Sequence, residues 1–145
     1  PRHQGACLPN YKEYPMKDRQ LPGYVALVLT DESSWKLREL AVHVDVYCRH
    51  VTLAFRPSPT VWAKFEPLVG QRFEVEVLGT VQDSRGQAAL VELPEGLECE
   101  NTYPFITISC AHGTNPAYSK NIVGREARII QEKLVMEGTV TFVPF

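Results

Sequence analysis

The stretch His50-Val51-Thr52-Leu53-Ala54-Phe55 has the alternation of a half-buried β-strand. Successive side chains of a strand point to opposite faces, so His50 and Thr52 share one face. Val51, Leu53 and Phe55 share the other face. The sequence therefore predicts a strand that carries an imidazole and a hydroxyl side by side on one surface, with an apolar surface behind them.

A second segment, Phe105-Ile106-Thr107-Ile108-Ser109-Cys110, follows the same pattern. Phe105 and Thr107 are expected on one face of this strand, together with Ser109. If the two strands lie near each other in one sheet, the hydroxyls of Thr52 and Thr107 line a common groove with the His50 imidazole. Such a groove is suited to holding a phosphate oxygen and to moving a proton beside it.

The flanking segments indicate an α+β fold. Residues 24–29 are predicted as a buried strand, and Asp31 or Ser33 as the cap of a helix that reaches Val44. Ser58-Pro59 begins a second helix, which Pro67 and Gly70 end. The period changes to two over residues 71–93, which predicts a β-hairpin with its turn at 83–86.

A helix over residues 125–135 and a strand over 138–145 complete the prediction. The expected sheet has about six or seven strands, mixed or antiparallel, with two or three helices. Residues 1–22 show no sustained period and are interpreted as an irregular lead-in, followed by one domain over 23–145.

Composition narrows the class of protein. The 145 residues are 44% hydrophobic and 22% charged, as in one ordinary globular domain. The net charge of -2 means that a nucleic-acid site would be a local patch. The longest apolar run, residues 25–29, is too short to cross a membrane. The four cysteines form no CxxC pair, so we expect no metal site, reduced thiols and an intracellular location, cytoplasmic or nuclear.

The two strand segments, with the GY-apolar strand and helix before the first and ITISCAHGTNPAYSKN at 106–121, resemble the 2H phosphoesterase superfamily. Within it the likeness is to the cyclic-phosphodiesterase domains attached to RNA and tRNA ligases, and it covers about residues 23–123. The resemblance implies a bilobal α+β fold in which two His-x-Thr strands face each other across a cleft. It implies a hydrolase that opens 2′,3′-cyclic phosphates in RNA repair or processing, without a metal or other cofactor.

The family's roles transfer to only some positions. His50 and Thr52 match the first motif, and Thr107 matches the threonine of the second. In the family one histidine is the general base, the other is the general acid, and the threonines hold the phosphate. Phe105 stands where the second histidine belongs, and a phenyl ring can neither donate nor accept a proton. Loss of a positioned acid or base typically costs about 10²- to 10⁴-fold in rate.

Further residues near the second strand are candidates for substrate binding. His112 replaces the missing histidine only if the loop at 112–116 folds back over the cleft. Phe105 can stack a base. Tyr118, Ser119 and Lys120 can supply hydroxyl groups and a cation to a phosphate.

Three interpretations follow from the sequence. The first is a domain that recognises the cyclic phosphate of an RNA end or of a small nucleotide. If this domain is an enzyme, it also hydrolyses the cyclic phosphate. The second is a catalytically degenerate binding module of a larger RNA-processing protein, because of Phe105 and the fragment-like start at Pro1. The third is an unrelated α+β domain, which would place the two strands far apart or turn Thr52 and Thr107 toward different layers.

Overall fold

The computed structural model describes residues 20–145, so most of the predicted lead-in lies outside the described residues. The elements are, in chain order, β1 (Gly23–Leu29), α1 (Asp31–Arg38), β2 (Asp45–Val46), β3 (His50–Phe55), α2 (Pro59–Phe65), η4 (Glu66–Leu68), β4 (Arg72–Gln82), β5 (Gly86–Glu92), β6 (Phe105–Cys110), η5 (Pro116–Asn121), β7 (Arg128–Ile129) and β8 (Val135–Pro144).

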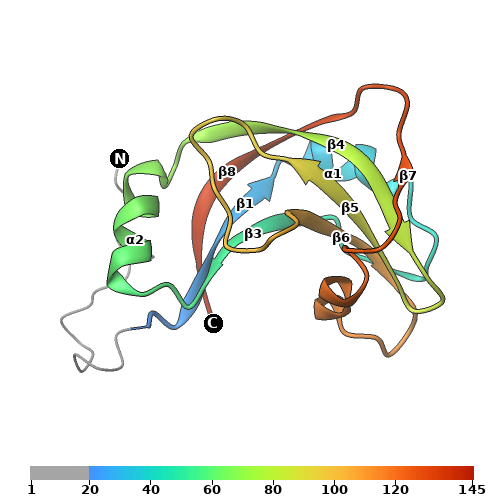
Figure 1. The fold of residues 1–145 in the computed structure, drawn as a ribbon, viewed down its shortest axis with the longest axis horizontal. Coiled ribbons are helices and arrows are strands. Elements are labelled where there is room, and N and C mark those ends of the chain that lie inside the picture. Colours follow the sequence, from blue (N-terminus) through green and yellow to red (C-terminus); the bar gives the residue numbers. More distant parts are fainter. Residues whose placement is uncertain (1–19) are drawn as a thin grey trace.

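The sheet closes on itself (Figure 1). Antiparallel pairing runs in the order β3-β1-β8-β4-β5-β6, and β6 pairs again with β3 to complete a six-stranded barrel. The short strands β2 and β7 add to β6 and β4. The predicted α+β class is confirmed, and of the two sheet types that the sequence left open, mixed and antiparallel, the pairings among the described strands are antiparallel. The two-lobed arrangement is not confirmed, because the pairings make one barrel.

The hydrophobic core fills this barrel. Met136, Val140 and Phe142 alternate inward along β8, and Val51 and Ile106 face the same core from β3 and β6. Helix α2 covers one end of the barrel, at the left of Figure 1. There the Trp62 ring meets the Phe142 ring edge-on, with 5.7 Å between the ring centroids. The outer surface of β3 and β6 therefore remains available for a site.

A β-bulge corrects one prediction about β3. The register of β1 with β3 shifts between Val25 and Ala26, so Leu53 and Ala54 are both buried. Phe55 is thereby turned to the outer surface, where 54% of it is exposed. Strict alternation along the strand predicts the inner face for this side chain.

Two helix predictions are also corrected. Helix α1 is capped by Thr30 and ends at Arg38, so Val44 is exposed rather than packed inward. The Gln87 side chain donates to the Leu40 carbonyl and accepts from the Val42 N–H, which draws the backbone out of the helix. Residues 125–135 form no helix. Their backbone pairs with β4 instead, through β7 and the N–H of Ile130, so tertiary pairing overrides the local apolar period.

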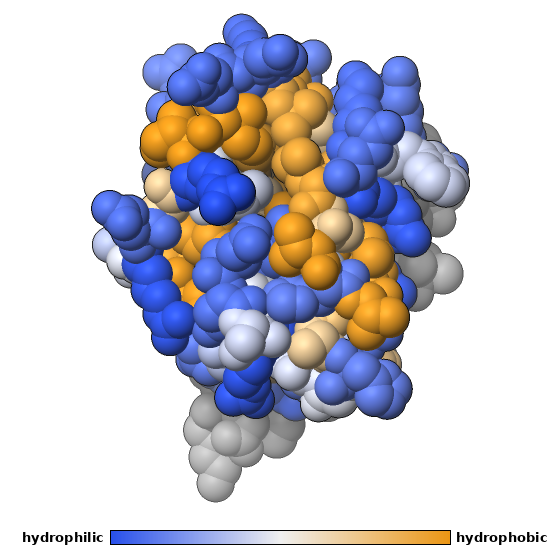
Figure 2. Space-filling model, turned by 90° about the vertical axis from the view of Figure 1, so that its right-hand side faces the viewer, coloured by the Kyte–Doolittle hydropathy of each residue, from blue (hydrophilic) through white to orange (hydrophobic). Residues whose placement is uncertain are grey.

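Figure 2 shows the end of the barrel that lies opposite α2 and carries β7. An irregular hydrophobic area on this face is bordered by hydrophilic side chains. Ile129 of β7 is one of the exposed hydrophobic residues, at 70%. No helix among residues 20–145 is long and apolar enough to cross a membrane.

The close approach of β1 and β8 gives a testable prediction. A Cβ added at Gly138 would lie 2.7 Å from the Val28 carbonyl oxygen and 2.9 Å from Leu27 Cγ. Such overpacking costs about 1–3 kcal/mol, so Gly138→Ala is expected to lower the free energy of unfolding in urea by about that amount.

Gly124→Ala is the matched control, because its Cβ would meet only Tyr103 Cε2 at an ordinary 3.5 Å. It should stay within about 0.5 kcal/mol of wild type. Equal stability of the two variants would contradict the β1–β8 packing.

Candidate functional site

The two motif strands are direct neighbours. β3 pairs antiparallel with β6, with Val51 opposite Ile106. One step to either side, this register places His50 opposite Thr107 and Thr52 opposite Phe105. Side chains directly opposite each other are about 4.5–5.5 Å apart at Cβ. The two strands therefore lie side by side, and both threonines face the same layer. The interpretation as an unrelated α+β domain predicted strands far apart or threonines that face different layers.

These four side chains line one pocket on the outer wall of the barrel. Its volume is about 260 Å³, slightly below the lower limit of about 300 Å³ for typical ligand pockets, so the pocket is small. The pocket is lined by Tyr24, Tyr47, Arg49, His50, Thr52, Phe105, Thr107 and Pro116.

The connection between β2 and β3 is held against β6 by Cys48. This residue adopts φ 52°, in the left-handed region, and its N–H donates to the Thr107 carbonyl. Its thiol donates to the Ile108 carbonyl, and burial raises the pKa of this thiol to about 11. Cys48 is therefore a structural residue, which places Tyr47 and Arg49 at the pocket.

His50 is held as a neutral imidazole at neutral pH. Burial lowers the pKa of His50, and the nearby positive charge of Arg49 lowers it further. The ring packs against Tyr24, with 5.3 Å between the centroids and a tilt of 39°. A neutral imidazole can accept a proton, so His50 has the protonation state required of a general base.

Thr107 is already hydrogen-bonded within the protein. Its hydroxyl donates to the Pro116 carbonyl at 3.2 Å and lies 2.9 Å from the Ser119 hydroxyl. Ser119 is fully buried. It therefore reaches the pocket only through Thr107, rather than by touching a ligand as the sequence suggested.

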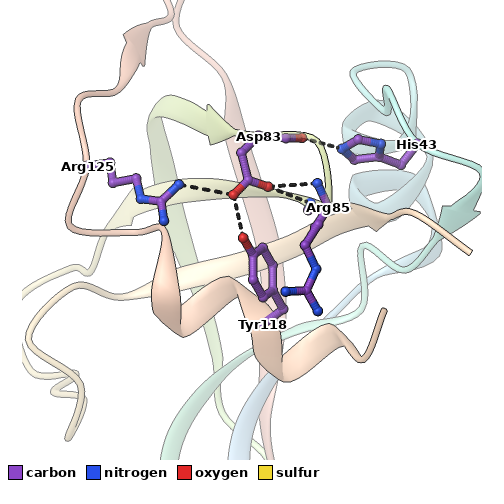
Figure 3. Close-up of polar contacts among 6 residues, drawn as sticks. His43, Asp83, Arg85, Tyr118 and Arg125 are labelled. Carbon is purple, nitrogen blue, oxygen red and sulfur yellow. Dashed lines mark hydrogen bonds and ion pairs between the residues drawn. The ribbon is translucent and has the colours of Figure 1, made fainter. Parts of the chain in front are cut away.

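A second polar cluster anchors η5 (Figure 3). The Tyr118 hydroxyl donates to the Asp83 carboxylate in the β4–β5 turn, and Arg125 pairs with the same carboxylate at 3.0 Å. Partial burial alone raises the pKa of Asp83, but these bonds and two backbone N–H donors outweigh it and lower the pKa to about 2. Tyr118 thus fixes η5, and with it Pro116 and Ser119, instead of lining the pocket.

Two further predicted residues lie away from the pocket. The His112 side chain is 93% exposed, with Nδ1 3.9 Å from the Asp45 carboxylate, and it is not among the lining residues. The loop at 112–116 does not fold back over the pocket, so His112 does not supply an imidazole there. Lys120 is exposed on η5 and does not line the pocket either.

Four lining residues are not among the candidates named from the sequence: Tyr24, Tyr47, Arg49 and Pro116. Tyr24 could have been found, because it alternates with buried residues on β1 and so points outward. Arg49 directly precedes His50, but its place at the pocket depends on the turn at Cys48.

A larger pocket, of about 640 Å³, lies between α2 and the segment at 96–100. Apolar side chains line it together with Lys64, Glu98 and Glu100, and it holds no imidazole. Burial raises the pKa of its Cys99 thiol, which donates a hydrogen bond to the Thr52 carbonyl. Within the described part of the chain, no three metal-binding side chains gather at one place.

No protein-family model matches the chain, and no curated protein matches it. Among solved structures, the crystal structure of a fungal RNA kinase is similar, with 13% sequence identity and a TM-score of 0.49. The match covers 85% of this chain and 44% of the kinase chain, so the chain spans less than half of that protein.

The lowered pKa of His50 predicts a pH dependence of stability. Below pH 6.5, the ordinary histidine value, the unfolded chain binds a proton at His50 that the folded protein does not. Stability is therefore lost as the pH falls from 6.5 to the lowered pKa. Urea unfolding at pH 7.5 and 5.5 should show a larger loss for wild type than for His50→Asn.

The range from pH 7.5 to 8.5 supplies the control, because the lowered pKa of His50 lies outside it, and there wild type and His50→Asn should show the same change in stability. If His50→Asn showed the same loss as wild type, the imidazole would not be desolvated in the folded protein.

Proposed function

We propose that this pocket binds the 2′,3′-cyclic phosphate at the end of an RNA or of a small nucleotide, and that His50 opens the ring slowly. The observation that carries the proposal is the gathering of His50, Thr52, Phe105 and Thr107 around one small pocket. The resemblance of both strands to the His-x-Thr motifs of 2H phosphoesterases supports the same substrate class.

Arg49 and Thr52 supply the binding energy for the phosphate. The guanidinium carries a fixed positive charge at the pocket, and the Thr52 hydroxyl can donate to a non-bridging oxygen. Thr107 donates to the phosphate only when its hydroxyl turns away from the Pro116 carbonyl. A local cation of this kind is sufficient for one phosphate, so the net charge of -2 does not oppose it.

His50 acts as the general base in the proposed reaction. It takes a proton from a water molecule whose oxygen attacks phosphorus, and the bond from phosphorus to one ribose oxygen breaks. In a two-histidine site an imidazolium would protonate that leaving oxygen. Here Phe105 occupies the position, so the proton comes from solvent and the reaction is slowed by about 10²- to 10⁴-fold.

A second candidate is a module that binds the phosphate end without turnover. Two observations favour it: Phe105 lines the pocket in place of a proton donor, and the Thr107 hydroxyl is used within the protein. In this case the pocket retains an RNA end for other domains of a larger RNA-processing protein.

Incubation with 2′,3′-cyclic nucleotides and with an RNA bearing a cyclic end tests the proposal. Wild type should bind both and hydrolyse them slowly, and His50→Ala should lower the rate at least about 10²-fold. Binding without turnover would select the second candidate. If the protein neither binds nor hydrolyses these ligands, both candidates are eliminated.

Restoring the second histidine tests whether the pocket is otherwise intact. Phe105→His places an imidazole opposite Thr52. The rate should rise by about 10²- to 10⁴-fold, because a general acid becomes available for the leaving oxygen.

Phe105→Gln is the control, since it adds a polar side chain of similar reach that does not titrate. Equal rates for the two variants would argue against acid catalysis from this position.

A further inference from the structure

We propose that a row of aromatic rings leading out of the pocket binds the bases of a single-stranded RNA whose phosphate end occupies the pocket. This inference rests on the proposed function and deepens it, because it makes an RNA strand rather than a mononucleotide the ligand. We use the name aromatic row for the rings of Tyr24, Phe145 and Phe55 together with the Arg56 guanidinium that lies over two of them.

The row begins inside the pocket. Tyr24 lines the pocket and contacts the His50 ring. The Tyr24 ring also lies 6.3 Å from the Phe145 ring, and the Phe145 ring lies 5.4 Å from the Phe55 ring, measured between centroids. The rings therefore form one continuous path from His50 to the surface. Figure 1 shows the three segments that supply it side by side: the start of β1, the end of β3 and the C-terminus.

The outer rings of the row are unusually exposed for phenylalanine. Phe55 is 54% exposed and Phe145 is 61% exposed, whereas phenylalanine is among the residues most often buried. Phe55 is outside because of the bulge in β3, and the N–H of Phe145 donates to the Pro22 carbonyl, which fixes its backbone. The fold thus holds two apolar rings in solvent beside the pocket.

Arg56 adds a positive charge to the same rings. Its guanidinium lies 4.6 Å from the centroid of Phe145 and 5.8 Å from that of Phe55. The residue adopts φ 46°, a left-handed conformation that is uncommon outside glycine, and its N–H donates to the Gly23 carbonyl. The fold therefore maintains a strained residue where it places a cation over exposed rings.

This chemistry favours a single-stranded nucleic acid. Aromatic rings stack on bases of any sequence, and guanidinium groups stack on bases and attract phosphates. Arg49 stands at the pocket end of the row and Arg56 at the far end, which complements a chain of phosphates. A carboxylate also contacts the row, since Glu100 accepts a hydrogen bond from the Phe55 N–H.

Binding of two ligands tests the proposal: an eight-nucleotide single-stranded RNA with a 2′,3′-cyclic phosphate end, and the matching cyclic mononucleotide. Each is titrated by fluorescence anisotropy or calorimetry before the ring opens. Phe55→Ala, Phe145→Ala and Arg56→Asn should each weaken binding of the octamer about 5- to 100-fold, as expected for a lost stacked base. Binding of the mononucleotide should stay within about twofold, because it reaches only the pocket.

The variants are chosen to keep the protein folded. Both phenylalanines are exposed, and asparagine tolerates the left-handed backbone at position 56. Trp35→Ala is the matched control, because Trp35 is 68% exposed and contacts Arg38 on α1 in the same ring-and-cation geometry. It should leave binding of the octamer unchanged.

The outcomes separate this inference from the proposed function. If both ligands bind and the row variants change neither, the aromatic row is refuted while the pocket function stands. If the octamer binds and the row variants weaken it, but the mononucleotide does not bind, the row stands and the pocket function fails. If sedimentation shows a wild-type dimer that the variants dissociate without a change in RNA affinity, the row is a self-association surface and the inference is overturned.

Discussion

The pairing of β6 with β3 is the contact on which the rest of the structure depends. Without it the sheet would end in two unpaired edges, whose backbone N–H and C=O groups need partners. With Val51 opposite Ile106, the barrel closes, and both residues enter one core. The same register brings the outward side chains of both strands into a single pocket. One pairing thus supplies stability on the inner face and the site on the outer face.

The pocket is shaped by segments outside those two strands. Cys48 turns the chain so that Tyr47 and Arg49 reach the pocket. On the other side, Asp83 holds Tyr118, and the resulting position of η5 sets the hydrogen bonds of Thr107. These hydrogen bonds give Thr107 a fixed orientation, but they also compete with a ligand for its hydroxyl. The pocket therefore combines the His50 imidazole with the Arg49 guanidinium, which lies 5.6 Å from the centroid of the Tyr47 ring.

Much of the fold follows from local patterns. The strands at residues 23–29 and 105–110, the Ser58 cap and the hairpin around Asp83 are found where period, capping and turn chemistry predict them. Predictions failed where a distant segment competes for the backbone. Gln87 ends α1 early, and β4 captures residues 128–130 in place of a helix. Local propensity is worth a few tenths of a kcal/mol per residue, so such contacts easily override it.

The sequence by itself determined which side chains share a face: His50 with Thr52 on one strand, and Phe105 with Thr107 on the other. Only the tertiary structure decided which of them meet, because strand register and barrel closure depend on contacts between residues far apart in the chain. It brought Phe105 opposite Thr52, left His112 in solvent and turned Ser119 inward. It also joined Tyr24, Phe55 and Phe145, which lie on three separate strands or ends, into one exposed aromatic surface.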